Sequence, residues 1–241
     1  MSLSTFGHAV QFLTRLPWPS VADFKPEDLS RSAGWFPVVG AIIGSIVALA
    51  LWLGLQASPW IGALLALVAW VWVTGGLHLD GLGDVADGFG AAHRSPDRFL
   101  EVLRDPHVGS FGVMAIGLQL IAKLVLLAEI SGFPALLGLV LVPAWARWGT
   151  QAWSLAVPPL SSGSGERFSW RINRPVVGLQ ACALALLSIW VAPVLLGALL
   201  IIPAIAVYWK RRLGFISGDC LGASVEVTET LLLLLIAVVM V

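Results

Sequence analysis

The sequence has very little charge. Only 12% of its 241 residues are Asp, Glu, Lys or Arg, whereas a soluble domain carries about 25%. Apolar residues make up 58% of the chain and its mean hydropathy is +0.90. This composition excludes a soluble globular fold and an intrinsically disordered chain. The formal net charge is zero, so the overall charge gives no argument for binding to nucleic acid, and we predict no nucleic-acid partner.

Cysteine and the common catalytic signatures are also scarce. The two cysteines, Cys182 and Cys220, lie far apart in the sequence and indicate neither a disulfide framework nor a zinc site. There is no Gly-x-Ser-x-Gly nucleophile motif, phosphate-binding loop or His-Glu zinc motif. No internal repeat points to the two halves of a transporter.

What the sequence has in abundance is long apolar runs, which predict an all-α, polytopic membrane protein built as a helical bundle. A spanning helix needs about 20 apolar residues, and about seven segments approach this requirement. They are Gly34–Gln56, Trp60–Leu79, Gly109–Ile130, Pro134–Val157, Pro175–Val191, Pro193–Trp209 and Leu221–Val241. Residues 1–32 are expected to form an interfacial arm, with Phe6, Phe12 and Trp18 at headgroup level. Residues 1–241 would then be a single integral membrane domain.

Basic residues mark one side of this bundle. The connections after the first, third and fifth predicted spans contain no charge, whereas the alternate connections and the N-terminal arm hold most of the 14 basic residues. The positive-inside rule makes that side cytoplasmic. We therefore expect a cytoplasmic N-terminus, an outside C-terminus and a cytoplasmic acidic loop over residues 80–108. Polar chemistry would face the cytoplasm.

The most informative stretch runs from Gly75 to Gly88. Asp80, Asp84 and Asp87 stand at i, i+4 and i+7, which puts them on one face of a helix. Because like charges this close repel, the cluster is costly unless a cation sits among them, and three carboxylates suit Mg²⁺. Mg²⁺ held by carboxylates typically bridges to phosphates, which indicates phosphoryl or nucleotidyl-phosphate transfer. The alternative is a solvated acidic cap at a helix end.

A second acidic group begins the last predicted span. Asp219 and Glu226 are seven residues apart and share a helix face, although Asp219 could instead cap the helix. Glu226 and Glu229 lie inside an apolar helix, where an ionisable side chain needs a wet cavity or a partner. We therefore expect both glutamates to line the same cavity as the Asp80 cluster.

Basic candidates lie within the spans and beside the acidic segment. Arg147 is near the middle of a span, too deep to reach the surface easily, and an anionic substrate would explain it. Lys123 fits such a role about as well as it fits snorkelling or a pair with Glu129. Arg104 closes the acidic segment, and His78 is a ligand, a base or simply a structural residue.

Five blocks of the sequence resemble the cobalamin synthase family, the adenosylcobinamide-GDP ribazoletransferases. They follow the order of the family's blocks over nearly the whole chain: Phe12–Pro17, Trp35–Gly40, Gly75–Gly88, Leu103–Gly109 and Gly218–Glu229. Lys123 and Arg147 also fall where that family has an intramembrane Lys and Arg.

The resemblance implies an Mg²⁺-dependent transferase of the bacterial cytoplasmic (inner) membrane that completes the nucleotide loop of cobalamin. It would join α-ribazole, or its 5′-phosphate, to adenosylcobinamide-GDP, giving adenosylcobalamin, or its 5′-phosphate, and GMP. Asp80, Asp84 and Asp87 would hold the metal. Catalytic roles would fall to Asp219, Glu226 and His78, and substrate binding to Arg15, Arg104, Asp105, Lys123, Arg147 and Glu229.

Two other functions stay open. A CDP-alcohol-type phospholipid headgroup phosphotransferase shares the Asp-x-x-Asp-Gly of Asp84–Gly88, but the residues that follow do not continue its signature. A cation-coupled membrane transporter would spread its charges through the bilayer, whereas most acids here gather on one side. The sequence also leaves a homo-oligomer open.

Overall fold

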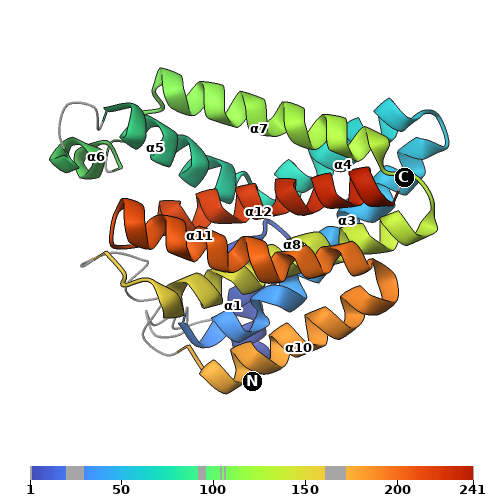
Figure 1. Cartoon of the computed structure of the whole chain (residues 1–241). Coiled ribbons are helices and arrows are strands. Elements are labelled where there is room, and N and C mark those ends of the chain that lie inside the picture. The colour runs from blue at the N-terminus through green and yellow to red at the C-terminus, as the bar shows by residue number, and fades with distance from the viewer. Residues whose placement is uncertain are drawn as a thin grey trace.

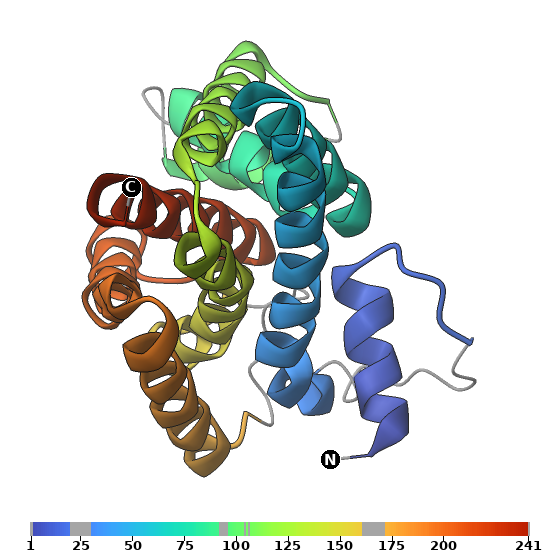
Figure 2. The same ribbon diagram turned by 90° about the vertical axis from the view of Figure 1, so that its right-hand side faces the viewer.

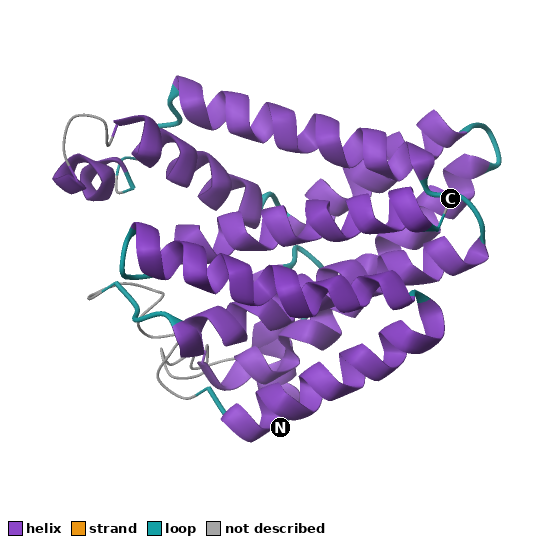
Figure 3. Ribbon diagram, viewed as in Figure 1, coloured by secondary structure: helices purple, strands orange, loops and turns teal. Residues whose placement is uncertain are grey.

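The computed structural model describes residues 2–19, 30–91, 96–103, 105, 107–160 and 172–240. Every regular element within these residues is a helix (Figures 1 and 3), which confirms the predicted all-α class. The elements are α1 (Leu3–Leu13), η1 (Ala33–Trp35), α3 (Phe36–Leu55), α4 (Pro59–Thr74), α5 (Leu77–Ala91), α6 (Pro96–Val102), α7 (Ser110–Glu129), α8 (Phe133–Ala156), α10 (Arg174–Val191), η2 (Pro193–Gly197), α11 (Ala198–Arg212) and α12 (Gly218–Val239).

The helices run back and forth between two ends of a bundle. In Figure 1, α5, α6 and the turn between α11 and α12 lie at the left end, whereas the α3–α4 and α7–α8 connections and the C-terminus lie at the right. Among the described residues, five helical segments are long and apolar enough to cross a membrane: 30–55, α7, α10, η2 with α11, and α12. The bent pair α4 and α5 makes a sixth candidate. The protein is therefore a polytopic helical membrane protein, as predicted.

The remaining predicted span, Pro134–Val157, forms a helix of 24 residues, α8, but α8 is not among the candidates that meet the hydropathy criterion. Its second half carries Arg147, Thr150 and Gln151, all buried. The helices α3, α10, α11 and α12 pack around α8, so these polar side chains meet protein and not lipid. A helix enclosed in this way does not need an apolar surface all round.

The predicted end of the second span, Trp60–Leu79, is wrong. α4 ends at Thr74, and the chain bends by 86° into α5. Gly75 and Gly76 allow this elbow because both adopt positive φ, 63° and 73°. The prediction of a loop over residues 80–108 is also wrong, because most of the described residues in this range are helical and belong to α5 and α6. The glycine pair starts a new helix in place of a loop.

α3 and α8 approach each other closely because two glycines face α8. A Cβ at Gly40 or Gly44 would overlap the backbone carbonyl of Pro143 or Val140, respectively. Small residues at such contacts are typical of helices packed within membranes, where close van der Waals contact replaces the hydrophobic effect. This contact holds α8 closely against α3.

The N-terminal arm lies on the protein. Figure 2 shows α1 standing beside the first part of α3. Phe6 packs edge-on against Trp18 and Trp35, with ring centroids 5.1 and 5.2 Å apart, and Phe12 stacks on Phe36. The aromatic residues expected at headgroup level therefore also attach the arm to the bundle. Its position at the membrane surface stays a prediction.

We predict that Gly44→Ala lowers the free energy of unfolding by about 1–3 kcal/mol, because the added methyl group must push α3 away from α8. Gly117→Ala on α7 is the matched control. A Cβ there meets nothing within 4 Å, so this variant should be neutral or slightly more stable. Thermal unfolding of the detergent-purified proteins compares the two, and equal melting temperatures would contradict the close α3–α8 contact.

Candidate active site

The acidic residues of two helices meet where α5 packs on the start of α12. A Cβ at Gly81 would lie 3.0 Å from the Cα and the carbonyl oxygen of Asp219, and one at Gly222 would lie 3.4 Å from the Cα of His78. Glycine at both positions therefore lets the two backbones come together. As a result Asp219, far away in sequence, joins the acidic cluster of α5.

Asp84 stands at the centre of this cluster. The charges of Asp80, Asp219 and Asp87 all act on its carboxyl group. Asp80 is exposed, and Asp84 and Asp219 are half-buried. Ser217 caps α12, because its side chain accepts a hydrogen bond from the backbone N–H of Cys220. The alternative of Asp219 as the helix cap is therefore wrong. Its carboxylate accepts a hydrogen bond of 3.4 Å from the Ser217 hydroxyl and acts by its charge on Asp84.

Asp87 is placed differently from its two partners. Its buried carboxylate accepts hydrogen bonds from the backbone N–H groups of Gly109, at 2.7 Å, and Gly112, at 2.9 Å. Gly109 is the N-cap residue of α7 and Gly112 lies in its first turn, and the start of a helix favours a carboxylate. Asp87 thus fixes the start of α7 against α5. Whether it also binds metal, as the sequence predicts, stays a prediction.

The donor chemistry of the cluster fits Mg²⁺. Carboxylate oxygens are the ligands that this ion prefers, and a cation would relieve the repulsion around Asp84. Within the described residues, however, no group of three or more His, Cys, Asp or Glu side chains already converges as a metal site. The ligand set of Asp80, Asp84 and Asp87 therefore remains a prediction.

A cleft of about 600 Å³ opens beside Asp80. Its lining includes Arg15, Thr74 and the elbow glycines, Gly75 and Gly76. The backbone N–H of Arg15 donates to the carbonyl of Val73 at 2.7 Å, which ties the N-terminal arm to the end of α4. The Arg15 side chain then lies directly over Gly75, where a Cβ would collide with it. The structure thus brings Arg15 and Asp80, both predicted site residues, to one cleft.

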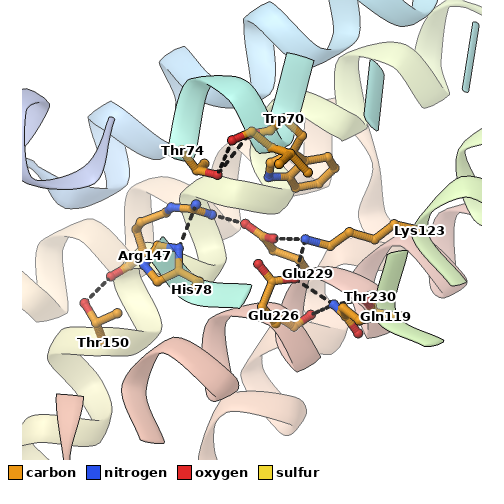
Figure 4. A network of polar contacts seen from close by, with 11 residues as sticks. Trp70, Thr74, His78, Gln119, Lys123, Arg147, Thr150, Glu226, Glu229 and Thr230 are labelled. Carbon is orange, nitrogen blue, oxygen red and sulfur yellow. Dashed lines mark hydrogen bonds and ion pairs between the residues drawn. The ribbon is translucent and has the colours of Figure 1, made fainter. Parts of the chain in front are cut away.

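Five further predicted site residues form a buried polar network, shown in Figure 4. Lys123 of α7 pairs with Glu226 at 2.7 Å and with Glu229 at 2.5 Å, both on α12. Glu229 also pairs with Arg147 of α8, whose guanidinium lies 3.3 Å from Nδ1 of His78 on α5. All five side chains are at most 7% exposed.

The network corrects two expectations. Glu226 and Glu229 face Lys123 and Arg147, and they do not appear in the lining of the cleft beside Asp80. Lys123 binds these two glutamates and not Glu129, which is exposed at the end of α7. Two acids and two bases thus neutralise one another within the bundle. Their catalytic or substrate-binding roles stay predictions.

Sequence reasoning missed three residues that contact the network, Gln119, Thr230 and Trp70. Nε2 of Gln119 donates to Oε2 of Glu226 at 2.8 Å and to Oγ1 of Thr230 at 2.7 Å. The ammonium of Lys123 lies 4.4 Å from the ring centroid of Trp70, a cation–π contact from α4. One signal was available, because Gln119 stands four residues before Lys123 on an otherwise apolar helix and so shares its face.

A second, polar pocket lies at the end of the bundle, beside α6. It has a volume of about 390 Å³ and is lined by Arg98, Asp105 and His107, among others. The side-chain hydrogen bond with His107, 2.6 Å from Nδ1 to Oδ1, holds the pKa of Asp105 below its ordinary value. Asp105 is therefore ionised at neutral pH. Arg104, predicted to bind substrate, lies outside the described residues.

Comparisons with known proteins agree over nearly the whole chain. The sequence model of a family described as Cobalamin-5-phosphate synthase matches residues 5–237. An adenosylcobinamide-GDP ribazoletransferase of Laribacter hongkongensis is 56% identical over 95% of this chain and 95% of its own. Those of Thiobacillus denitrificans and Novosphingobium aromaticivorans are 51% and 48% identical, each over 95% of this chain and 93% and 94% of their own. No solved structure matches significantly.

We predict that Glu229→Gln lowers the free energy of unfolding by about 3–5 kcal/mol, because Lys123 and Arg147 lose the charge that they share inside the bundle. Glu129→Gln, an exposed position on α7, is the control and should change stability by less than about 0.5 kcal/mol. Denaturant unfolding in detergent measures both. Two variants of equal stability would show that the network does not hold the helices together.

Proposed function

Because the chain belongs to the Cobalamin-5-phosphate synthase family, we propose that it joins α-ribazole, or its 5′-phosphate, to adenosylcobinamide-GDP at the cleft between the N-terminal arm and α5. GMP leaves, and adenosylcobalamin or its 5′-phosphate forms. In this reaction a ribose hydroxyl forms a new bond to the phosphorus nearest the cobinamide, while the bond from that phosphorus to GMP breaks. The family disfavours the lipid phosphotransferase and the transporter.

One observation carries the placement of the reaction. The carboxylates of Asp80 and Asp84 on α5 and of Asp219 on α12 are close enough for their charges to act on one another, and Asp80 and Arg15 line the same cleft. A diphosphate is itself anionic, so it would be repelled by three carboxylates unless a cation lay between them. The combination is therefore suited to a diphosphate that arrives with a divalent ion.

Asp80 and Asp84, with Asp87 as the third ligand, would hold Mg²⁺, and Asp219, whose charge acts on Asp84, would complete the set. When bound, the ion supplies charge that stabilises the attacked phosphorus and the departing GMP. The chain's own contribution is to keep these carboxylates together against their repulsion. It does so through the Gly81 and Gly222 contacts of α5 with α12.

Asp219 is better placed than Glu226 to take the proton of the attacking hydroxyl. Asp219 is half-buried and belongs to the open cluster, whereas Glu226 is held by Lys123 and Gln119 inside the network. His78 is equally enclosed, with Nδ1 beside Arg147. A general base must reach the proton that it abstracts, which favours Asp219 for this role.

Arginine suits the phosphate groups because its planar guanidinium binds two oxygens at once. Arg15 lies over the elbow in the cleft and is placed for this role, and Arg104 is proposed for it from the sequence. Asp105, ionised at the end of the second pocket, is proposed to contact a more distant part of the substrate.

The network of Lys123, Arg147, Glu226, Glu229 and His78 is proposed to position α5. It joins α5 to α7, α8 and α12 through buried charges. Because Asp80 follows His78 by two residues, fixing His78 also fixes the first carboxylate of the cluster. Lys123, Arg147 and Glu229 would then support substrate binding without touching the substrate.

The distribution of basic residues supports a proposal for the side of the bilayer on which the active site lies. The basic residues Lys210, Arg211 and Arg212 end α11 at the same end of the bundle as α5 and α6 (Figure 1). The positive-inside rule supports a cytoplasmic location for this end. We therefore propose that the active site faces the cytoplasm from the bacterial inner membrane.

We predict that Asp84→Asn lowers turnover about a hundredfold or more, since a weakened metal site costs several kcal/mol of transition-state stabilisation. The assay uses detergent-purified protein with adenosylcobinamide-GDP and α-ribazole, with Mg²⁺ or EDTA, and follows GMP and the corrinoid product by chromatography. Glu101→Gln on α6, an exposed acid that pairs with Arg98, is the control and should keep full activity. Near-normal Mg²⁺-dependent turnover by Asp84→Asn would refute the assigned metal site.

We predict that Asp219→Asn and Glu226→Gln fail in different ways. Asp219→Asn should lower kcat about 10²- to 10⁴-fold with an unchanged melting temperature, as expected for loss of a general base. Glu226→Gln should lower the melting temperature, because Lys123 and Gln119 lose a charged partner. Turnover and thermal unfolding are measured on each variant. A stable, inactive Glu226→Gln protein would move the base to Glu226.

A further inference from the structure

An apolar groove of about 400 Å³ runs along the side of the bundle where three helices meet. Its walls come from α5, α11 and α12, and they consist of Leu82, Val85, Ala86, Phe89, Ile205, Tyr208, Trp209, Ala223, Ser224 and Val227. Two of these helices, α11 and α12, belong to candidate membrane spans, and α5 belongs to the bent pair. In a bilayer that these helices cross, the groove would border the hydrocarbon region.

The polar atoms of the inner wall are already bonded to each other. The indole N–H of Trp209 donates to Oγ of Ser224 at 2.7 Å, and that hydroxyl donates to the carbonyl of Cys220 at 2.6 Å. Apart from the hydroxyl of Tyr208, the remaining surface is hydrocarbon and aromatic, including Phe89 stacked near Trp209. Such a surface recognises an apolar chain, because a polar ligand would leave its own groups without hydrogen bonds.

Positive charge stands at the mouth of the groove. Lys210, Arg211 and Arg212 directly follow the groove residues Tyr208 and Trp209 on α11, and all three basic side chains are exposed. The guanidinium of Arg212 lies 5.2 Å from the ring centroid of Phe89. The basic cluster is thus joined to the groove by a direct contact and not only by sequence.

We propose that this groove is a binding site for an anionic phospholipid, with one acyl chain in the groove and the headgroup phosphate on Lys210, Arg211 and Arg212. Basic residues at a membrane surface attract anionic lipids by about 1 kcal/mol each, and the groove adds the burial of the chain. The acyl chain of a zwitterionic lipid would also fit the groove, but its headgroup carries no net negative charge to attract the three basic residues. The site is independent of the proposed reaction.

A bound lipid would also pack against α5 and support its position. The groove residues Leu82, Val85 and Phe89 lie on the face of α5 turned to α11 and α12, and Asp84 projects from the same helix. Filling the groove therefore supports the helix that carries the acidic cluster. Lipid binding is expected to raise the melting temperature, because it favours the folded state.

The test titrates detergent-purified, delipidated protein with phosphatidylglycerol or with phosphatidylcholine of the same acyl chains and counts bound lipids by native mass spectrometry. The first phosphatidylglycerol should bind at least about tenfold more tightly than phosphatidylcholine. The combined variant Lys210→Gln, Arg211→Gln and Arg212→Gln should abolish this preference. Equal affinities in the unchanged protein, or a preference that survives in this variant, would overturn the proposal.

A second pair of variants tests the groove itself. Val227→Trp fills it and should weaken the first bound lipid of either kind at least about tenfold, by removing buried acyl surface. Leu200→Trp on α11, a position that is 78% exposed and outside the groove, should leave binding unchanged. Equal lipid binding by the Val227→Trp and Leu200→Trp variants would overturn the proposal. Displacement of the lipid by α-ribazole would also overturn it, because the groove would then be a substrate-binding site. Thermal unfolding confirms that each variant is folded.

Discussion

Glu229 of α12 forms ion pairs with Lys123 of α7 and Arg147 of α8 in the interior of a membrane-spanning bundle. Charged groups are costly at such a depth unless they meet a partner, so the three helices must come together at one level. The contact of Arg147 with His78 adds α5 to the set. Once these four helices are joined, the first residues of α5 are fixed, and the acidic cluster follows from their position.

The protein treats its acidic residues in two opposite ways. Glu226 and Glu229 are neutralised by cations and excluded from water, which stabilises the arrangement of helices without supplying reactive groups. Asp80, Asp84 and Asp219 are instead brought together in a more open place, where they repel one another. Repulsion of this kind is relieved by a divalent cation and its phosphate ligands. The stable network thus supports the unstable cluster that the proposed reaction needs.

Much of the fold was predictable, because the bilayer restricts the possibilities. Apolar length alone located the helices around 36–55, 110–129 and 218–239, since a spanning segment must satisfy its own backbone hydrogen bonds. The elbow at Gly75 and Gly76 was not predictable in this way. The apolar run continues through it to Leu79, and hydropathy does not register a positive φ at two glycines.

The sequence by itself determined the membrane class, the uneven distribution of basic residues among the connections and the identity of the acidic residues, because composition and spacing along one chain carry that information. Tertiary structure decided which charges meet. Lys123 forms ion pairs with Glu226 and Glu229, more than 100 positions away, and not with the nearby Glu129. Asp87 accepts a hydrogen bond from Gly109 at the start of α7. Asp219 joined Asp84 through a glycine contact. Partners between helices depend on depth and rotation, which are set by packing and not by sequence separation.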